Sequence, residues 1–234
     1  MGRSMGYNLS VNNIIKGGHI MKLNGIKANF LGDSITEGCG TSDFGTKPFH
    51  AILGKRYNMT TRNYGIGGTR IARQTNLSTE WPQMDRDYCL RIEELDRDAD
   101  LVVIFGGTND YGHGDAPFGE AADRTPDTFI GACHYLFRRA TELFPRARIV
   151  VMTPLHRWGE YNPDMKGRVL EEYVNVIRDT AAKYSIPVID LWKNSGIQPE
   201  IEVIRELYCP DGLHPNDEGH VRMADYIEAA LLAL

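Results

Sequence analysis

Leu101-Val102-Val103-Ile104-Phe105 is a run of five apolar residues that no polar side chain interrupts. A strand with one face in water alternates apolar and polar residues, whereas an uninterrupted run is typical of a parallel strand covered on both faces. Four other segments also have the composition of strands: residues 28–31, 60–64, 149–152 and 187–191. We therefore expect residues 101–105 to lie at the centre of a parallel sheet.

Amphipathic segments separate these strands. Apolar residues recur at helical spacing in residues 49–57, 129–144, 170–184 and a last helix that begins near Asn216. The Thr125-Pro126 pair is expected to begin the second helix, and residues 81–95 have a weaker helical pattern. Four residues of the last helix are expected to face the core: Val221, Ala224, Ile227 and Leu231. This alternation predicts an open α/β sheet with helices on both faces.

The composition is that of an ordinary globular protein. The chain has 234 residues, of which 42% are hydrophobic and 24% charged, and its net charge is −5. This charge, without any run of lysine and arginine, argues against a nucleic acid as partner. We expect one domain over residues 23–234, preceded by a polar N-terminal extension, residues 1–22, of unknown function.

The four cysteines are widely spaced and include no CxxC pair, and they are Cys39, Cys89, Cys133 and Cys209. This spacing is typical of free thiols in a reducing compartment. No segment approaches the ~20 apolar residues of a membrane span, and the N-terminus has no signal-peptide pattern. We therefore expect a cytoplasmic protein without a membrane span. The sequence does not determine its oligomeric state.

Reactive side chains follow four of the predicted elements, where ligands bind in an open α/β sheet. They lie in four segments: Gly32-Asp33-Ser34-Ile35-Thr36, Asn63-Tyr64-Gly65-Ile66-Gly67-Gly68-Thr69, Gly106-Gly107-Thr108-Asn109-Asp110 and Asp211-Gly212-Leu213-His214-Pro215. Each segment alone is explained by ordinary structure. The serine could cap a helix, the glycines could form a turn, and the asparagine could bond its own backbone.

The four segments together supply every group that acyl transfer needs. Ser34 is a candidate nucleophile, His214 a base that titrates near neutrality, and Asp211 the carboxylate that orients the base. Donors for an oxyanion are the backbone N–H groups of Ser34 and Gly68 and the side-chain amide of Asn109. This chemistry needs no metal and no cofactor.

The segments GDSIT, NYGIGG, GGTND and DGLHP resemble the four sequence blocks of the SGNH (GDSL-type) hydrolase family, in the family's order. The resemblance implies the same roles for Ser34, Asp211 and His214, with Gly68 and Asn109 in the oxyanion hole. It ranks Gly68 above its neighbours Gly65 and Gly67 only by block alignment. It also implies a flavodoxin-like three-layer α/β/α sandwich with a five-stranded parallel sheet.

The predicted function is a serine esterase or acylhydrolase that cleaves small acyl esters, including acetyl esters of carbohydrates, through an acyl-enzyme. Alternatives are a thioesterase or lysophospholipase of the same family and a non-catalytic binding module on the same fold. A metal-dependent hydrolase would use Asp33, Asn109, Asp211 and His214, but the chain lacks the paired ligand motifs of such sites.

Two predicted loops, residues 106–124 and 154–165, are longer than the fold requires and are candidates for substrate contacts. Asp110 and His113 in the first loop lie near the expected site. The second loop supplies His156, Trp158 and Tyr161 as further candidates, with Arg157 between them. Three other histidines fall within helical patterns and are expected at the surface or its boundary: His50, His134 and His220.

Overall fold

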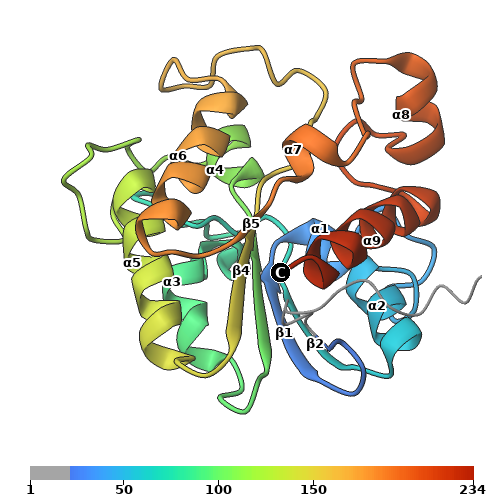
Figure 1. The fold of residues 1–234 in the computed structure, drawn as a ribbon. Helices are drawn as coiled ribbons and strands as arrows, with labels where there is room; N and C mark the ends of the chain where they lie inside the picture. Colours follow the sequence, from blue (N-terminus) through green and yellow to red (C-terminus); the bar gives the residue numbers. More distant parts are fainter. Residues whose placement is uncertain (1–21) are drawn as a thin grey trace, which may run out of the picture.

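The centre of the molecule is a parallel sheet of five strands with the order β2-β1-β3-β4-β5 (Figure 1). The computed structural model describes residues 22–234. The strands are β1 (Lys27–Gly32), β2 (Thr60–Gly65), β3 (Leu101–Phe105), β4 (Arg148–Met152) and β5 (Val188–Ile189). The apolar run β3 pairs with β1 on one side and with β4 on the other. The predicted central strand and the flavodoxin-like strand order are therefore confirmed.

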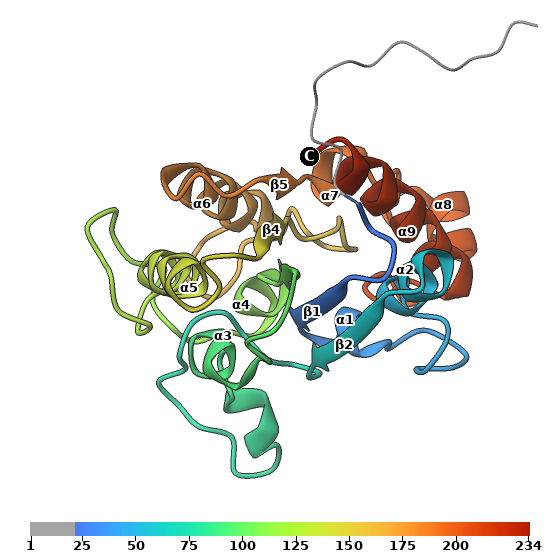
Figure 2. The same ribbon diagram turned by 60° about the horizontal axis from the view of Figure 1, so that its bottom comes forward.

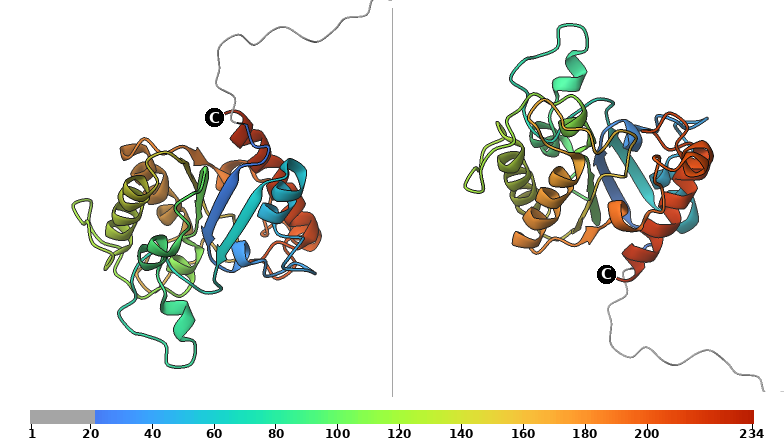
Figure 3. Two further views of the ribbon diagram at one scale, coloured as in Figure 1. Left: turned by 90° about the horizontal axis from the view of Figure 1, so that it is seen from below. Right: turned by 90° about the horizontal axis from the view of Figure 1, so that it is seen from above.

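Helices cover both faces of the sheet, as Figures 2 and 3 show from different directions. Alternate β3 residues enter two separate cores, so Val102 packs with one layer and Val103 with the other. The first layer contains α3 (Tyr88–Arg91), α5 (Phe129–Leu143) and α6 (Leu170–Lys183). The opposite layer contains α2 (Phe49–Tyr57) and α9 (Asp217–Leu232). The predicted three-layer α/β/α sandwich is confirmed.

The helix ends follow local capping rather than the apolar pattern alone. Thr128 accepts a hydrogen bond from the backbone N–H of Gly131 and caps α5, so the prediction that Thr125-Pro126 begins this helix was wrong. Asn216 caps α9 in the same way, as predicted. Within α9, Val221 is 38% exposed and Met223 is buried, which corrects the predicted inner face at one position.

Two predicted elements differ in extent. Strand β5 is only two residues long, because Asp190 caps α7 (Leu191–Asn194) and its carboxylate also binds Arg178 and Thr153. Residues 81–95 do not form one helix. Asp87 caps the short helix α3, which separates the 3₁₀ turns η1 (Pro82–Asp85) and η2 (Ile92–Glu94).

Besides α7, three short helices at the carboxyl end of the sheet were not predicted. They are α1 (Ser34–Glu37), α4 (Thr108–Gly112) and α8 (Glu202–Tyr208). Helix α4 lies inside the segment that the sequence pattern assigns to a loop. Helices α7 and α8 both lie between β5 and the Asp211 segment. At four to seven residues, these helices are too short for an apolar period to be recognised.

The histidines predicted at the surface or its boundary are buried, with exposures of 4% for His50, 2% for His134 and 0% for His220. Each has a partner that tolerates a neutral imidazole. His50 contacts the carbonyl of Thr36, His134 contacts the hydroxyl of Tyr184, and His220 accepts the backbone N–H of Phe49. The helical pattern could not reveal this, because imidazole fits either environment.

The predicted extension, residues 1–22, lies outside the described residues except for Lys22, and the single-domain assignment stays a prediction. No helix within residues 22–234 combines the length and apolar character needed to cross a membrane. The carboxyl ends of β1, β2 and β3 are the upper ends of these strands in Figure 1, next to α1 and α4. The four predicted segments meet at this end.

Candidate active site

Ser34 is the first residue of α1, directly after β1. The residue that caps this helix is Asp33, whose carboxylate accepts the N–H of Ile35 at 3.0 Å. The serine hydroxyl is therefore not used for capping and is free for another partner. Gly38, with a φ of 117°, ends the helix after one turn. The ordinary reading of Ser34 as a helix cap does not hold in this fold.

The hydroxyl of Ser34 lies next to His214. The distance from Ser34 Oγ to His214 Nε2 is 2.9 Å, although the two residues are 180 positions apart in the chain. On the other side of the ring, His214 Nδ1 lies 2.7 Å from Oδ2 of Asp211. A proton on Nδ1 leaves Nε2 as an acceptor for the serine hydroxyl. The three side chains form one continuous hydrogen-bonded line.

Asp211 is held in place by the backbone of its own turn. Its Oδ1 accepts the N–H groups of Leu213 at 2.8 Å and His214 at 2.7 Å, which leaves Oδ2 for the imidazole. Partial burial disfavours the charged carboxylate, but these hydrogen bonds outweigh it, so the pKa of Asp211 lies below its usual range. The carboxylate is therefore ionised at neutral pH and favours the Nδ1–H tautomer of His214.

Of the three glycines in the second segment, only Gly68 lines the same cavity as Ser34. The N–H of Gly65 is bound by Asn63 and that of Gly67 by Glu37, each at 2.8 Å. The N–H of Gly68 has no acceptor among residues 22–234. Its φ of +74° is in the left-handed region, and a Cβ there would collide with Met84. This position therefore requires glycine.

Asn109 lies in the first turn of α4, at the carboxyl end of β3. Gly107, with a φ of 109°, turns the chain from the strand into this helix. The side-chain amide of Asn109 donates one hydrogen bond, of 3.1 Å, to the carbonyl of Thr69. Because the amide has two hydrogens, one remains for another acceptor. The contact also fixes the amide beside the Gly68 segment.

Two buried charged residues support this arrangement: Asp110, which the sequence suggested only as a possible substrate contact, and Arg91, which was not predicted. Asp110 accepts the N–H groups of Ile71 and Ala72, each at 2.9 Å, so its carboxylate holds backbone instead of facing the pocket. Burial raises the pKa of Asp110 to about 6. Arg91 is 2% exposed and binds the hydroxyl of Thr69 and the carbonyl groups of Gly32 and Tyr64.

Arg91 therefore joins the ends of β1 and β2 to the segment that follows Gly68. Its sequence neighbourhood contains the two 3₁₀ turns and gives no sign of this role. A fully buried guanidinium with backbone acceptors becomes evident only when the strand ends are assembled. The contact fixes the Ser34 and Gly68 segments relative to one another.

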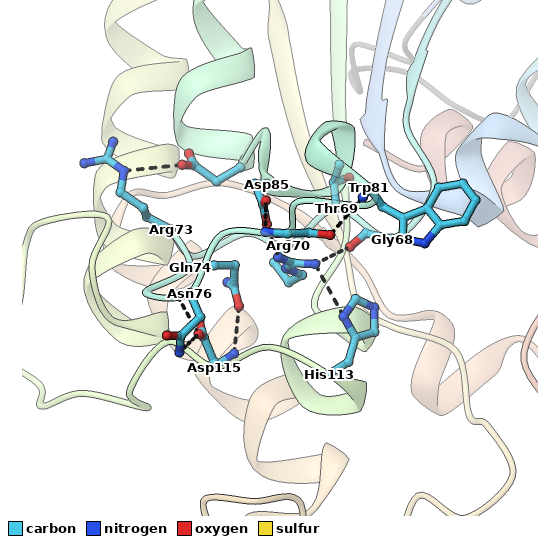
Figure 4. A network of polar contacts seen from close by, with 12 residues as sticks. Gly68, Thr69, Arg70, Arg73, Gln74, Asn76, Trp81, Asp85, His113 and Asp115 are labelled. Atoms are coloured by element: carbon cyan, nitrogen blue, oxygen red, sulfur yellow. Dashed lines mark hydrogen bonds and ion pairs between the residues drawn. The ribbon is translucent and has the colours of Figure 1, made fainter.

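A second buried arginine, Arg70, contacts the Gly68 segment, as Figure 4 shows. Arg70 donates to the carbonyl of Gly68 at 3.0 Å and forms an ion pair with Asp85 at 2.8 Å. The same guanidinium lies 3.4 Å from Nδ1 of His113. Partial burial and the cations Arg70 and Arg157 lower the pKa of His113. His113 is thus neutral at pH 7.

The cavity at this site has a volume of about 320 Å³. Its lining includes residues from all four predicted segments: Ser34, Cys39, Gly68, Asn109, Gly112, His113, Arg157, Leu213 and His214. A larger cavity of about 620 Å³ lies at the amino ends of the strands, beside Ile26 and Arg148. That cavity is at the opposite end of the sheet, and its lining includes none of Ser34, Asp211 and His214.

The three predicted candidates in the second long loop do not line the 320 Å³ cavity. His156 pairs with Glu160 at 2.8 Å and lies against the ring of Trp192, away from the 320 Å³ cavity. Tyr161 is 66% exposed and does not line that cavity either. Trp158 lines an adjoining hollow of about 290 Å³. Arg157 is the one residue of the loop that lines both spaces.

The metal-dependent alternative finds no support in the placement of its residues. Asp33 is buried against the backbone of Ile35, whereas Asp211 is turned toward His214. Within residues 22–234, no three side chains of histidine, cysteine, aspartate or glutamate form a group that could hold a metal ion. His214 is hydrogen-bonded to Ser34 and Asp211 instead.

Known proteins are similar to this chain in sequence and in fold. The model of the GDSL-like Lipase/Acylhydrolase family matches residues 30–222. The GDSL lipase Rv0518 of Mycobacterium tuberculosis is 29% identical over 205 residues, 84% of this chain and 78% of that protein. A crystal structure of a Lactobacillus plantarum protein has a TM-score of 0.78 at 26% identity, covering 90% of this chain and 98% of its own. The acetyl xylan esterase AlAXEase has a TM-score of 0.60 at 23% identity and covers 88% and 99%, a likeness of fold alone.

Proposed function

Because the chain belongs to the GDSL-like lipase/acylhydrolase family, which consists of carboxylic ester hydrolases, we propose that it is a serine esterase that cleaves small acyl esters. The observation that carries this proposal is the continuous line from Ser34 Oγ through His214 to Asp211, with distances of 2.9 and 2.7 Å. Such a line is what a hydroxyl needs to become a nucleophile at neutral pH.

In the proposed mechanism, Ser34 Oγ attacks the ester carbonyl carbon while its proton passes to Nε2 of His214. The carbonyl π electrons move to oxygen, and Asp211 stabilises the imidazolium that forms. His214 then returns the proton to the leaving alcohol, whose bond to carbon breaks and leaves an acyl group on Ser34. Water repeats the two steps through His214 and releases the carboxylic acid.

The developing oxyanion would be bound by three donors. Two are the backbone N–H groups of Ser34 and Gly68, and the third is the free amide hydrogen of Asn109. In support, the N–H of Gly68 is unbound, while those of Gly65 and Gly67 are occupied. Loss of one such donor costs about 10²–10³-fold in kcat in other serine hydrolases.

The substrate we propose has a short acyl group. The cavity has a volume of only about 320 Å³, and among the described residues that line it Leu213 is the one aliphatic side chain, so a short acyl group fits it better than a long chain. This disfavours the lysophospholipase alternative. The fold is shared with an acetyl xylan esterase, so an acetylated carbohydrate is the first natural substrate to test. All four cysteines are free thiols, in keeping with the proposed cytoplasmic location.

The test is hydrolysis of p-nitrophenyl acetate by the wild-type protein and by Ser34→Ala. We expect the variant to lose about 10³-fold or more in kcat, because no other hydroxyl among residues 22–234 is bonded to His214. Ser78→Ala, a serine in the loop before η1, serves as the matched control and should retain activity. Undiminished hydrolysis by Ser34→Ala would reject the site. A folded wild type that hydrolyses no short ester or thioester would favour the binding module.

A further inference from the structure

Arg157 lies in the wall of the 320 Å³ cavity and has no anionic partner among residues 22–234. Its Nη1 donates weakly to Thr108, at 3.2 Å from the carbonyl oxygen and 3.3 Å from the hydroxyl. Its Nε is buried and has no acceptor. Among residues 22–234, neither an ion pair nor a hydrogen bond engages Nη2. A guanidinium has five N–H donors, so most of this group's capacity is unused.

The other two arginines near the site, Arg70 and Arg91, have stronger or more numerous acceptors than Arg157. Arg70 has the carboxylate of Asp85 at 2.8 Å, and the buried Arg91 has three oxygen acceptors. Arg157 has only the two oxygens of Thr108. A half-buried charge with so few partners is costly unless something in the cavity compensates it. The deficit therefore points to a group that enters from solvent.

Gly112 and Tyr111 fix the position of the Arg157 side chain. A Cβ on Gly112 would lie 2.7 Å from Nη1 of Arg157, so only glycine allows the guanidinium to approach α4 this closely. Arg157 also lies 5.5 Å from the ring centre of Tyr111. These contacts fix the cation between the catalytic cavity and the adjoining hollow beside Trp158.

The carboxylates around the cavity are already engaged. Asp211 binds His214, Glu37 binds the N–H of Gly67, and Asp33 is buried against the N–H of Ile35. None of them forms an ion pair with Arg157 within the part of the chain that the structure describes. The low proton affinity of His113 fits the same positive surroundings, since burial and then Arg70 and Arg157 disfavour its charged form.

We propose that Arg157 binds a carboxylate that the substrate carries in addition to its scissile ester. This inference rests on the proposed esterase function and narrows it to half-esters of small dicarboxylic acids or to esters of carboxylate-bearing alcohols. A single available guanidinium matches a single negative charge, and its N–H groups suit the planar oxygens of a carboxylate. Nη2 of Arg157, which has no partner among residues 22–234, supplies the donors. Gly112 has no side chain that would displace the guanidinium from this position.

The competing explanation is that Arg157 only holds Thr108, and with it Asn109, in place. In that case its loss would lower hydrolysis of every ester by the same factor. A role in recognition changes the ratio between anionic and neutral esters instead. The ratio of kcat/KM values therefore separates the two explanations.

The experiment compares two matched pairs of esters. For the acyl side, the pair is p-nitrophenyl hemisuccinate and its neutral methyl ester. For the alcohol side, the pair is 4-acetoxybenzoate and its methyl ester. Wild type, Arg157→Gln and Arg157→Lys are assayed, with Arg138→Gln as the control of equal charge change. Arg138 lies on α5 and its side chain is 68% exposed, away from the cavity.

We expect the wild type to prefer the anionic member of one pair, and the pair that responds identifies the side of the ester. Arg157→Gln should lower that anionic-to-neutral ratio by about 10- to 100-fold, the effect of one hydrogen-bonded charge. Arg157→Lys should restore part of the ratio, and Arg138→Gln should keep it. Equal losses for both members of each pair, or no preference in the wild type, would overturn the inference.

A binding measurement keeps this test separate from the proposed function. Succinate and benzoate are titrated into Ser34→Ala and into Ser34→Ala/Arg157→Gln by calorimetry. Binding that disappears with Arg157 supports the carboxylate site whether or not the wild type is an esterase. No binding by Ser34→Ala, together with Ser34-dependent hydrolysis of neutral esters only, rejects the site and leaves the esterase proposal intact.

Discussion

The buried His220 should make the fold sensitive to acid, and replacement by asparagine should remove that sensitivity. His220 is completely buried in α9. Its Nδ1 accepts the N–H of Phe49 at 3.1 Å, while its Nε2 has no partner. Burial, followed by the nearby His50, lowers the pKa of His220 to about 3. In His220→Asn, the amide oxygen takes the place of Nδ1 as the acceptor for Phe49.

The magnitude follows from the difference between the folded and unfolded pKa. An unfolded histidine, with a pKa of about 6.5, binds a proton as the pH falls below that value, whereas folded His220 stays neutral until about pH 3. The unfolded state is thus favoured progressively between these two values. At about pH 5 the gap is about 1.5 pH units, which amounts to about 2 kcal/mol at 1.36 kcal/mol per unit.

The assay is urea unfolding of both proteins at about pH 7.5 and pH 5. Other titrating groups, such as Asp33 and Asp110, change the stability of both proteins alike, so they cancel in the difference. We expect the wild type to lose about 2 kcal/mol more than His220→Asn between the two pH values. Leu231→Ala destabilises the same layer by about 2–5 kcal/mol without changing a titrating group. Its further loss of unfolding free energy between the two pH values should equal that of the wild type. Equal acid losses in wild type and His220→Asn would refute the reasoning.

Two further predictions concern the proposed catalytic groups. Asp211→Asn should lower kcat roughly 100-fold or more with little change in KM, because asparagine no longer favours the Nδ1–H tautomer of His214; a kcat that stays within about threefold of wild type, measured by ester hydrolysis, would contradict this role. Gly68→Ala should lower kcat by roughly tenfold or more, because a Cβ meets Met84 and the φ of +74° is strained. Met84→Ala combined with it should recover only the part of the loss that comes from the clash, and full recovery would show that the backbone conformation is unimportant.

The sequence predicted the sheet well because its signals are local. The uninterrupted β3 run reflects burial on both faces, and a residue's burial in a central strand is readable from its neighbours in the chain. The same reading failed at β5, where Asp190 turns the chain into α7 after two strand residues. It also failed at residues 81–95, because the cap at Asp87 interrupts the apolar pattern.

The candidate site was also predicted only in part from the sequence. The four segments that contain Ser34, Gly68, Asn109 and His214 were chosen from the sequence, and the fold places them around one cavity. Which glycine leaves its N–H free was not readable, since that depends on side-chain hydrogen bonds, one from Asn63 in the same strand and one from Glu37 in α1. His156, Trp158 and Tyr161 were the predicted candidates of the second long loop, yet Arg157 is the residue of that loop that lines the cavity.

By itself, then, the sequence determined which strand lies at the centre of the sheet, the helical layers and the candidate catalytic side chains, because these depend on patterns within a few residues. Only the tertiary structure decided which groups meet. The 2.9 Å contact between Ser34 and His214 spans 180 residues, and the unpaired Arg157 depends on Gly112 and Thr108 from another segment. Charge balance in a cavity is a property of everything that surrounds it, and a linear sequence does not contain those distances.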